Sequence, residues 1–165
     1  MNLVLIAPAI PDAIVDLRYA TINNIVGRQL YEDSVAKLDA AVLDRLTIAA
    51  ERLRQQDLRL VIWDAYRPLE VQRQLQAIDK DPRYVSDNSM HCRGLAVDAT
   101  LASSEGRYLD MGTDFDELTE RDHVDTSAIN DEQRKNRLLL QNVMEAAGFT
   151  QWPYEWLHYD LRAPS

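Results

Sequence analysis

The chain has 165 residues, 46% of them hydrophobic, which is enough for one sizeable core and predicts a single domain over residues 1–165. Its 27 acidic side chains outnumber the 18 basic ones, and the net charge of -9 repels nucleic-acid phosphates and anionic membrane surfaces. We therefore expect neither nucleic acid nor a membrane as a partner, and the composition leaves the oligomeric state open.

The cysteine content and the N-terminus both favour a cytoplasmic location. Cys92 is the only cysteine, so no disulfide can form within the chain, which is compatible with a reducing compartment. The apolar residues 1–10 lack a preceding basic region, and Pro8 and Pro11 interrupt the segment before a long apolar run develops. The sequence therefore predicts neither a signal peptide nor a transmembrane helix.

The first half of the chain contains one long periodic segment. Residues 15–20 begin with alternating apolar and polar side chains and predict a short strand, followed by an irregular loop. From Ser34 to Leu53, apolar residues recur with a period of about 3.6 residues, which predicts a helix with Asp33 or Ser34 as its N-cap.

A strand and a second helix follow in the middle of the chain. Residues 58–63 are mostly apolar and predict a strand. Pro68 suits the first position of a helix, where its missing N–H has no partner to lose, and the pattern continues to residue 78 before Asp81 and Pro82 end it.

The second half alternates a strand, a long loop, a helix and two further strands. Residues 95–100 predict a strand on which Asp98 shares a face with the small residues Ala96 and Thr100, leaving space beside the carboxylate for an ion. Residues 102–129 are too long and irregular for a simple connection, and such loops are often functional. Asn130 opens a helix that Gly148 ends, and residues 149–152 and 156–160 predict the last strands.

Two distant segments carry side chains suited to binding a metal ion. His91 and Asp98 are seven residues apart with Gly94 between them, and His158 follows Glu155 by three residues. Two histidines and one carboxylate supply three ligands suited to zinc and leave a fourth position for water. Because residues three apart point to opposite faces of a strand, we expect Glu155 in the turn before the strand, from which it can fold back toward a metal held by His158.

Other roles are open to several of these residues. Taken alone, His91 and His158 are each equally well explained as hydrogen-bonded loop residues. The presence of Asp98 and Glu155 in the same two motifs favours a metal site. His123 has charged neighbours, which favour a solvated face over ligation. A cysteine hydrolase would need Cys92 beside a base, but the side chains of His91 and Cys92 would point apart on an extended segment.

Arg67 and two tyrosines also have an ordinary and a functional interpretation. An arginine at a strand-to-helix turn is usually a surface ion-pair former, yet its permanent charge is what a developing oxyanion requires. Tyr19 and Tyr31 bracket the irregular loop, and such tyrosines are commonly half-buried packing residues with a hydrated hydroxyl.

At these residues the sequence resembles the VanX-type D-alanyl-D-alanine dipeptidases, within the wider zinc D,D-peptidase family. The family pattern reads S-x-H-x-x-G-x-A-x-D, followed by E-x-W-H or a variant. This chain fills its two motifs with Ser89, His91, Gly94, Ala96 and Asp98, and with Glu155, Trp156 and His158. The resemblance extends to residues 16–21, 63–68 and 109–116 and so covers nearly the whole chain.

The resemblance implies a zinc enzyme with an α+β fold, in which helices flank a small, mostly antiparallel sheet. It assigns one zinc ion per chain to His91, Asp98 and His158. It makes Glu155 the general base and then the general acid, and it makes Arg67 the group that stabilises the tetrahedral intermediate.

The resemblance also implies a substrate, D-Ala-D-Ala or a similar small D,D-dipeptide. Asp116 would receive its ammonium group, and Ser89, Tyr19 and Tyr31 would line the dipeptide pocket. A peptidoglycan D,D- or L,D-carboxypeptidase would share the metal site, but a carboxylate reserved for a free ammonium argues against it. A non-catalytic, zinc-stabilised binding module would need no general base such as Glu155.

Overall fold

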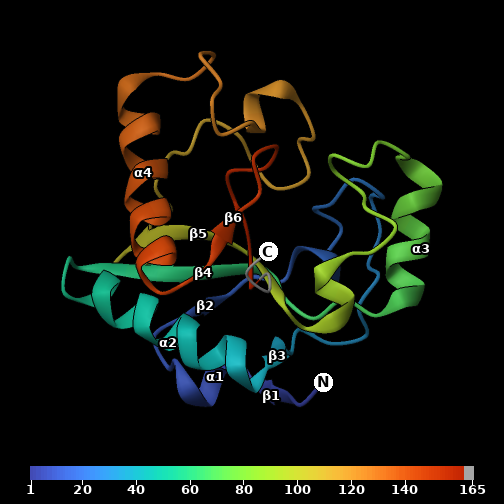
Figure 1. Ribbon diagram of the computed structural model, residues 1–165, viewed down its shortest axis with the longest axis horizontal. Coiled ribbons are helices and arrows are strands. Elements are labelled where there is room, and N and C mark those ends of the chain that lie inside the picture. The colour runs from blue at the N-terminus through green and yellow to red at the C-terminus, as the bar shows by residue number, and fades with distance from the viewer. Residues whose placement is uncertain (162–165) are drawn as a thin grey trace.

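The structure is a computed structural model that describes residues 1–161, and its framework is a five-stranded sheet with the strand order β2-β4-β5-β7-β6 (Figure 1). In that order the strands span Ile14–Val15, Leu58–Asp64, Ala96–Ser103, His158–Asp160 and Thr150–Gln151. β2 runs parallel to β4, and the other neighbouring strands are antiparallel. The expected α+β fold with a small, mostly antiparallel sheet is confirmed.

The remaining elements surround this sheet. A second sheet pairs β1 (Leu3–Leu5) with β3 (Lys37–Asp39) in antiparallel register. The helices are α1 (Ile6–Ala9), α2 (Ala40–Arg54), α3 (Leu69–Ile78) and α4 (Asp131–Ala146), and short 3-10 helices are η1 (Arg18–Ala20), η2 (Met90–Arg93) and η3 (Glu120–Asp122). None of the helices in residues 1–161 combines the length and the apolar character that crossing a bilayer requires.

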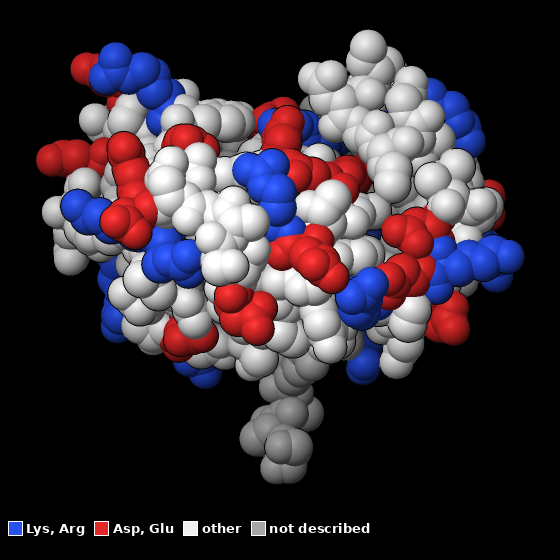
Figure 2. Space-filling view, turned by 90° about the horizontal axis from the view of Figure 1, so that it is seen from above, with Lys and Arg blue, Asp and Glu red and all other residues white. Residues whose placement is uncertain are grey.

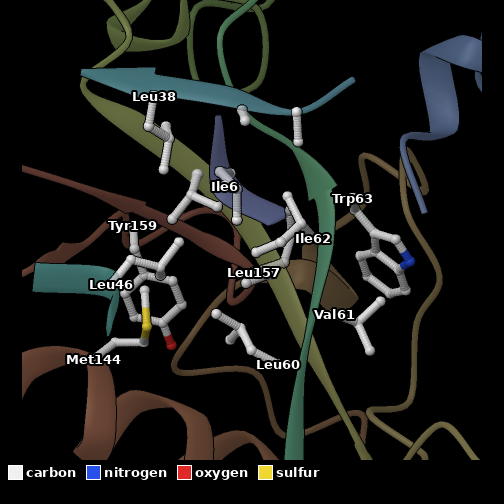
Figure 3. Close-up of a cluster of buried hydrophobic side chains, with 14 of the residues drawn as sticks. Ile6, Leu38, Leu46, Leu60, Val61, Ile62, Trp63, Met144, Leu157 and Tyr159 are labelled. Atoms are coloured by element: carbon white, nitrogen blue, oxygen red, sulfur yellow. The ribbon is translucent and has the colours of Figure 1, made fainter. Parts of the chain in front are cut away.

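The two faces of the five-stranded sheet have different surroundings. Side chains alternate between the faces along β4. Figure 3 shows Leu46 of α2, Met144 of α4 and Tyr159 of β7 gathered with Leu60 on one side of β4, whereas Trp63 lies on the other side. The helices α2 and α4 therefore build the main core on one face. The long loop that follows β5 and the turn before β7 both pack on the opposite face.

Aromatic side chains cover part of this opposite face. The ring centroid of Trp63 lies 5.9 Å from that of Phe115 in the long loop and 5.9 Å from that of Trp156 in the turn before β7. These contacts anchor the loop and the turn to the sheet, because each large ring buries a substantial apolar area. They hold residues 115 and 156 at fixed places near the strands β4, β5 and β7.

The long helix α2 begins later than its apolar periodicity predicts. It starts at Ala40 with Asp39 as N-cap, whose Oδ1 accepts a hydrogen bond of 3.2 Å from the Ala41 N–H, and not near Ser34. The preceding residues form β3, because they pair with β1 far earlier in the chain. Leu38 is apolar at a position that suits either a strand or the helix, so local periodicity could not separate the two.

The strand predicted over residues 15–20 is also shorter than expected. The Asp16 N–H still donates to the Ile62 carbonyl, but the chain then leaves the sheet and turns into η1. The turn buries Tyr19, whose ring packs edge-on against Tyr31 and Phe115. Aromatic packing therefore ends a strand whose local pattern would have allowed it to continue.

Near the C-terminus the helix agrees with prediction, while the strands are shorter. Asn130 caps α4 through a reciprocal pair of hydrogen bonds with Gln133, and Gly148 follows the helix with φ of 96°, a value that favours glycine. Within residues 149–160 only Thr150–Gln151 and His158–Asp160 are strands, because the residues between them turn. α3 spans Leu69–Ile78 as expected, with Pro68 at its cap and not inside it.

Charged side chains are distributed over the surface in both signs. Figure 2 shows Lys and Arg side chains interspersed with Asp and Glu on the face seen from above. The excess of acids is therefore spread over this face and does not form a separate acidic lobe there.

Candidate functional site

Three side chains with metal-binding chemistry meet where η2, β5 and β7 come together. Asp98 of β5 lies directly opposite His158 of β7 in the antiparallel register, so both side chains point to the same face of the sheet. η2 brings His91 to the same place, and Gly94, with φ of 68°, ends η2 and turns the chain into β5. One ligand atom from each of the three side chains lies within 4.8 Å of the other two.

The hydrogen bonds around the two histidines direct a nitrogen lone pair from each ring to one point. His91 Nδ1 donates to the Ala65 carbonyl at 2.7 Å, and His158 Nε2 lies 3.4 Å from Asp160 Oδ2. The opposite nitrogens, His91 Nε2 and His158 Nδ1, are 3.2 Å apart, and they lie 3.2 and 3.0 Å from Asp98 Oδ1. Two lone pairs and a carboxylate oxygen around one point fit a metal cation, and this donor set suits zinc.

The charges of this cluster are strongly coupled. Burial alone would raise the pKa of Asp98, but His91 and His158 outweigh burial and hold that pKa well below its usual range. Burial alone would lower the pKa of His158, but hydrogen bonds to Asp160 and Asp98 raise it to about 10. The protonation of Asp98 and that of His158 therefore depend on each other.

Glu155 lies in the turn before β7, as the spacing to His158 predicted. Its backbone N–H donates to the Trp152 carbonyl, and its own carbonyl accepts from the His158 N–H, so the turn fixes where the side chain starts. Burial, together with the negative charge of Asp98, raises the pKa of the Glu155 carboxyl to about 8. A carboxyl group with a pKa near neutrality can both take up and release a proton.

Arg67 is buried and does not make the surface ion pair that is common at such turns. Its Nε and Nη2 donate to Asp64 Oδ2 at 2.9 and 2.7 Å, and its Nη1 donates to Gln72 Oε1 at 2.6 Å. Burial would lower the pKa of Arg67, but Asp64, Tyr19, Tyr31 and Asp98 together outweigh burial and keep the guanidinium charged. Arg67 also lies 3.8 Å from Asp98 Oδ2, which places its charge beside the candidate metal site.

These groups line a cavity of ≈ 380 Å³, near the lower end of the range of roughly 300–1,000 Å³ that is usual for small-molecule sites. The predicted site residues that line it are Tyr19, Arg67, Ser89, His91, Asp98, Asp116, Glu155 and His158. The structure therefore brings together nearly all of the predicted site residues, although they come from separate parts of the chain.

Asp116 occupies one wall of the cavity and is held by two donors. Its Oδ1 accepts from the Tyr19 hydroxyl at 2.9 Å, and its Oδ2 accepts from the Ile25 N–H at 3.0 Å. Burial raises the pKa of Asp116 to about 6, because these hydrogen bonds compensate only part of the lost hydration. The carboxylate is thus poorly solvated and would gain from a cationic partner.

Tyr31 is the exception among the predicted substrate-binding residues. It does not contribute to the cavity wall, and its hydroxyl donates to Asp64 Oδ1 behind Arg67. Asp64 and Gln72 are both fully buried and were not singled out from the sequence. The position of Asp64 at the end of an apolar strand, three residues before Arg67, was the one available signal.

The segment of residues 82–88, which we call the mouth segment, forms another wall of the cavity. The Tyr84 hydroxyl lies 2.8 Å from His123 Nε2, and Trp152 Nε1 donates to the Arg83 carbonyl at 2.7 Å. His123 is half-buried and packs against Tyr154 at 5.2 Å between ring centroids. The prediction of a solvated face for His123 is therefore wrong, because aromatic contacts outweigh its charged sequence neighbours.

Cys92 follows His91 in a 3-10 helix, and not in the extended segment that the cysteine-hydrolase argument assumed. Burial raises the pKa of the Cys92 thiol, which disfavours the nucleophilic thiolate. The two ring nitrogens of His91 already face the Ala65 carbonyl and Asp98. The arrangement of imidazole, carboxylate and guanidinium groups around one cavity is instead typical of single-ion metallohydrolases.

Comparison with known proteins agrees with this class. The peptidase M15 family model, described as D-ala-D-ala dipeptidase, matches residues 1–164. The chain belongs to this family of metallopeptidases.

Curated proteins named D-alanyl-D-alanine dipeptidase are similar over most of the chain. The protein of Escherichia coli is 38% identical over 163 residues, which are 97% of this chain and 84% of that protein. The protein of Enterococcus faecium is 31% identical over 89% of this chain and 85% of its own length. The protein of Streptomyces coelicolor is 29% identical, with the same coverage of 89% and 85%.

Proposed function

We propose that the protein is a zinc-dependent dipeptidase that hydrolyses D-Ala-D-Ala or a similar small D,D-dipeptide. The observation that carries the proposal is that one small cavity is lined by the His91, Asp98 and His158 cluster and by Glu155, Arg67 and Asp116. Family membership and the names of the relatives support the same reaction and substrate class.

His91 Nε2, Asp98 Oδ1 and His158 Nδ1 are the atoms that would hold the zinc. When bound, zinc polarises a carbonyl group and lowers the pKa of water. The Ala65 carbonyl and Asp160 keep the two imidazoles in the tautomers that ligation requires. Because Asp98 and His158 are paired across two adjacent strands, their spacing is set by the sheet.

Glu155 and Arg67 would carry the proton and charge transfers. Glu155 takes a proton from the attacking water and returns it to the leaving amine, and its carboxyl lines the same cavity as the three ligands. Arg67 faces the negative charge that develops on the scissile carbonyl oxygen. Its contacts with Asp64 and Gln72 fix the guanidinium before substrate arrives, so little reorganisation is required during the reaction.

Asp116 would select for a free amino terminus. Its buried carboxylate gains a charged partner when it binds an ammonium group, whereas an N-acylated substrate would leave it unpaired, at a cost of roughly 1–3 kcal/mol. This is the reason to favour a dipeptidase over a carboxypeptidase that acts on longer peptides. A non-catalytic zinc module is disfavoured because it would have no use for Arg67 and Glu155 in the cavity.

The decisive experiment compares D-Ala-D-Ala, its N-acetyl derivative, L-Ala-D-Ala, L-Ala-L-Ala and acetylated pentapeptide, each with zinc and after chelation. We expect zinc-dependent cleavage of D-Ala-D-Ala, with a kcat/KM for the N-acetyl derivative lower by about tenfold or more. The Asp116→Ala variant should lose much of this preference. Equal kcat/KM for the free and N-acetylated dipeptides would favour the carboxypeptidase, and no hydrolysis of any substrate would favour the binding module.

A further inference from the structure

One buried polar side chain beside the site has two hydrogen-bond partners, and the mechanism above uses only its contact with Arg67. Gln72 lies in α3 with a relative exposure of 1%. Its Oε1 accepts from Arg67 Nη1 at 2.6 Å, and its Nε2 donates to the Ser86 carbonyl at 2.7 Å. Gln72 therefore joins the guanidinium of Arg67 to the backbone of the mouth segment.

The chemistry of the two partners fixes the orientation of this amide. A guanidinium group can only donate hydrogen bonds, and a backbone carbonyl can only accept them. The Gln72 oxygen must therefore face Arg67 and its nitrogen must face Ser86, and a flipped amide would lose both bonds. Because the group is buried, water cannot replace a lost partner at low cost.

The contact with Ser86 differs from the other contacts of the mouth segment. Trp152, between β6 and β7, donates to the Arg83 carbonyl, and the Tyr84 hydroxyl contacts His123 in the long loop after β5. Gln72 contacts Arg67 as well as the mouth segment. The two hydrogen bonds of Gln72 therefore link the position of the mouth segment to that of the guanidinium.

We propose that Gln72 is a positioning residue that aligns Arg67 with the mouth segment. This one side chain would fix the position of the guanidinium that stabilises the oxyanion and the position of the wall that confines the dipeptide. The kinetic part of this inference rests on the proposed dipeptidase function. Loss of the Arg67 contact should lower kcat, because Arg67 acts on charge that develops in the transition state. Loss of the Ser86 contact should raise KM, because the wall contacts the bound substrate.

Two substitutions separate these effects. Gln72→Leu removes both hydrogen bonds at similar side-chain volume. In Gln72→Glu at pH 8, the carboxylate still accepts from Arg67, but it cannot donate to the Ser86 carbonyl and repels it. Gln76→Leu is the matched control, because the Gln76 amide lies 3.4 Å from the same Ser86 carbonyl and contacts Asp87, yet it does not contact Arg67.

Steady-state kinetics of the zinc-loaded, full-length protein on D-Ala-D-Ala test the kinetic part. Gln72→Leu should lower kcat about tenfold or more and raise KM, whereas Gln72→Glu should keep kcat within about threefold and raise KM about fivefold. Gln76→Leu should leave kcat within about twofold, because Gln76 does not contact Arg67. An unchanged kcat in Gln72→Leu, or an equal loss of kcat in Gln76→Leu, overturns the assignment.

Hydrogen exchange tests the coupling without reference to activity. The backbone amides of residues 84–88 should exchange faster in Gln72→Leu and Gln72→Glu, and also in Arg67→Lys, where the Gln72 oxygen loses its planar partner. Unchanged exchange in Arg67→Lys and in a folded Gln72 variant overturns the coupling. If the unmodified protein does not cleave D-Ala-D-Ala, the proposed function fails, and the exchange measurements still decide the positioning role of Gln72.

Discussion

At the scale of single residues, Asp116 shows a conflict between stability and function. Burial raises its pKa to about 6, so ionisation of the folded protein is harder than ionisation of the unfolded chain, whose aspartates titrate near 3.8. The stability associated with neutral Asp116 is present below pH 3.8 and is lost as the pH rises through 6, by roughly 2–3 kcal/mol in total. Above pH 6 the ionised carboxylate of Asp116 therefore destabilises the fold, and a bound ammonium group would offset this loss.

This linkage predicts that Asp116→Asn stabilises the metal-free protein at pH 8 and that the gain shrinks at pH 4.5. Asparagine tolerates the positive φ of 58° at this position, and its amide can still pair with Tyr19 and the Ile25 N–H. Thermal unfolding at the two pH values measures the effect, with the exposed neighbour change Asp114→Asn as control. A gain of equal size at both pH values would show that ionisation of Asp116 is not its cause.

The second residue-scale prediction concerns Glu155→Gln. The amide cannot accept the proton of the attacking water, so turnover should fall by about 10²–10⁴-fold, while zinc binding persists because Glu155 is not one of the three clustered ligands. Metal analysis and kcat on the same preparations measure the two properties, with Glu145→Gln on α4 as control. Near-full activity would mean that another group is the base.

At the scale of elements, local sequence patterns correctly predicted the ends of those helices that are set by residues close in the sequence. The ends of α3 and the Asn130 cap of α4 follow from side chains within one turn of the helix terminus. The start of α2 did not follow, because residues 37–39 are held in a strand by β1. A single sequence carries no local record of that distant pairing, so the periodicity of α2 was extended too far.

The cap of α4 gives the element-scale prediction. Asn130→Ala removes the acceptor for the Gln133 N–H and should cost about 1 kcal/mol, which lowers the Tm by roughly 2–4 °C in a protein of this size. Asn130→Asp keeps the acceptor and should be nearly neutral. Since Asn130 lies outside the cavity wall, kcat should be unchanged in both variants. Equal losses of Tm in the two variants would contradict a capping role.

At the scale of the whole molecule, the groups that carry the chemistry were visible in the sequence and the groups that support them were not. His91, Asp98, Glu155 and His158 stand in two recognisable motifs. The Ala65 carbonyl reaches His91, and Gln72 reaches Arg67, only because the fold brings the strand-to-helix turn and α3 to the site. Buried hydrogen-bond partners have no fixed sequence spacing, so a motif alone could not identify them.

The same architecture makes metal binding a property of the whole fold. The three clustered ligands come from η2, β5 and β7, and unfolding separates all three. Zinc should therefore bind the folded state far more tightly than the unfolded chain and stabilise it by about 2.7 kcal/mol when free zinc is 100 times the dissociation constant. Chelation should lower the Tm correspondingly, and the shift should depend on zinc concentration.

Two histidine variants test whether the zinc-dependent rise in Tm comes from the three clustered ligands or from general binding of zinc to the acidic surface. His158→Ala should lose most of the zinc-dependent rise in Tm, because it removes one ligand of the cluster. His123→Ala should keep that rise even if its starting Tm is lower, because His123 contacts Tyr84 and Tyr154 and lies outside the cluster. The quantity to compare is the increment in Tm on adding zinc to each chelated variant. A full increment in His158→Ala, or its loss in His123→Ala, would place the metal elsewhere and would remove the basis for assigning Glu155 and Arg67 to catalysis.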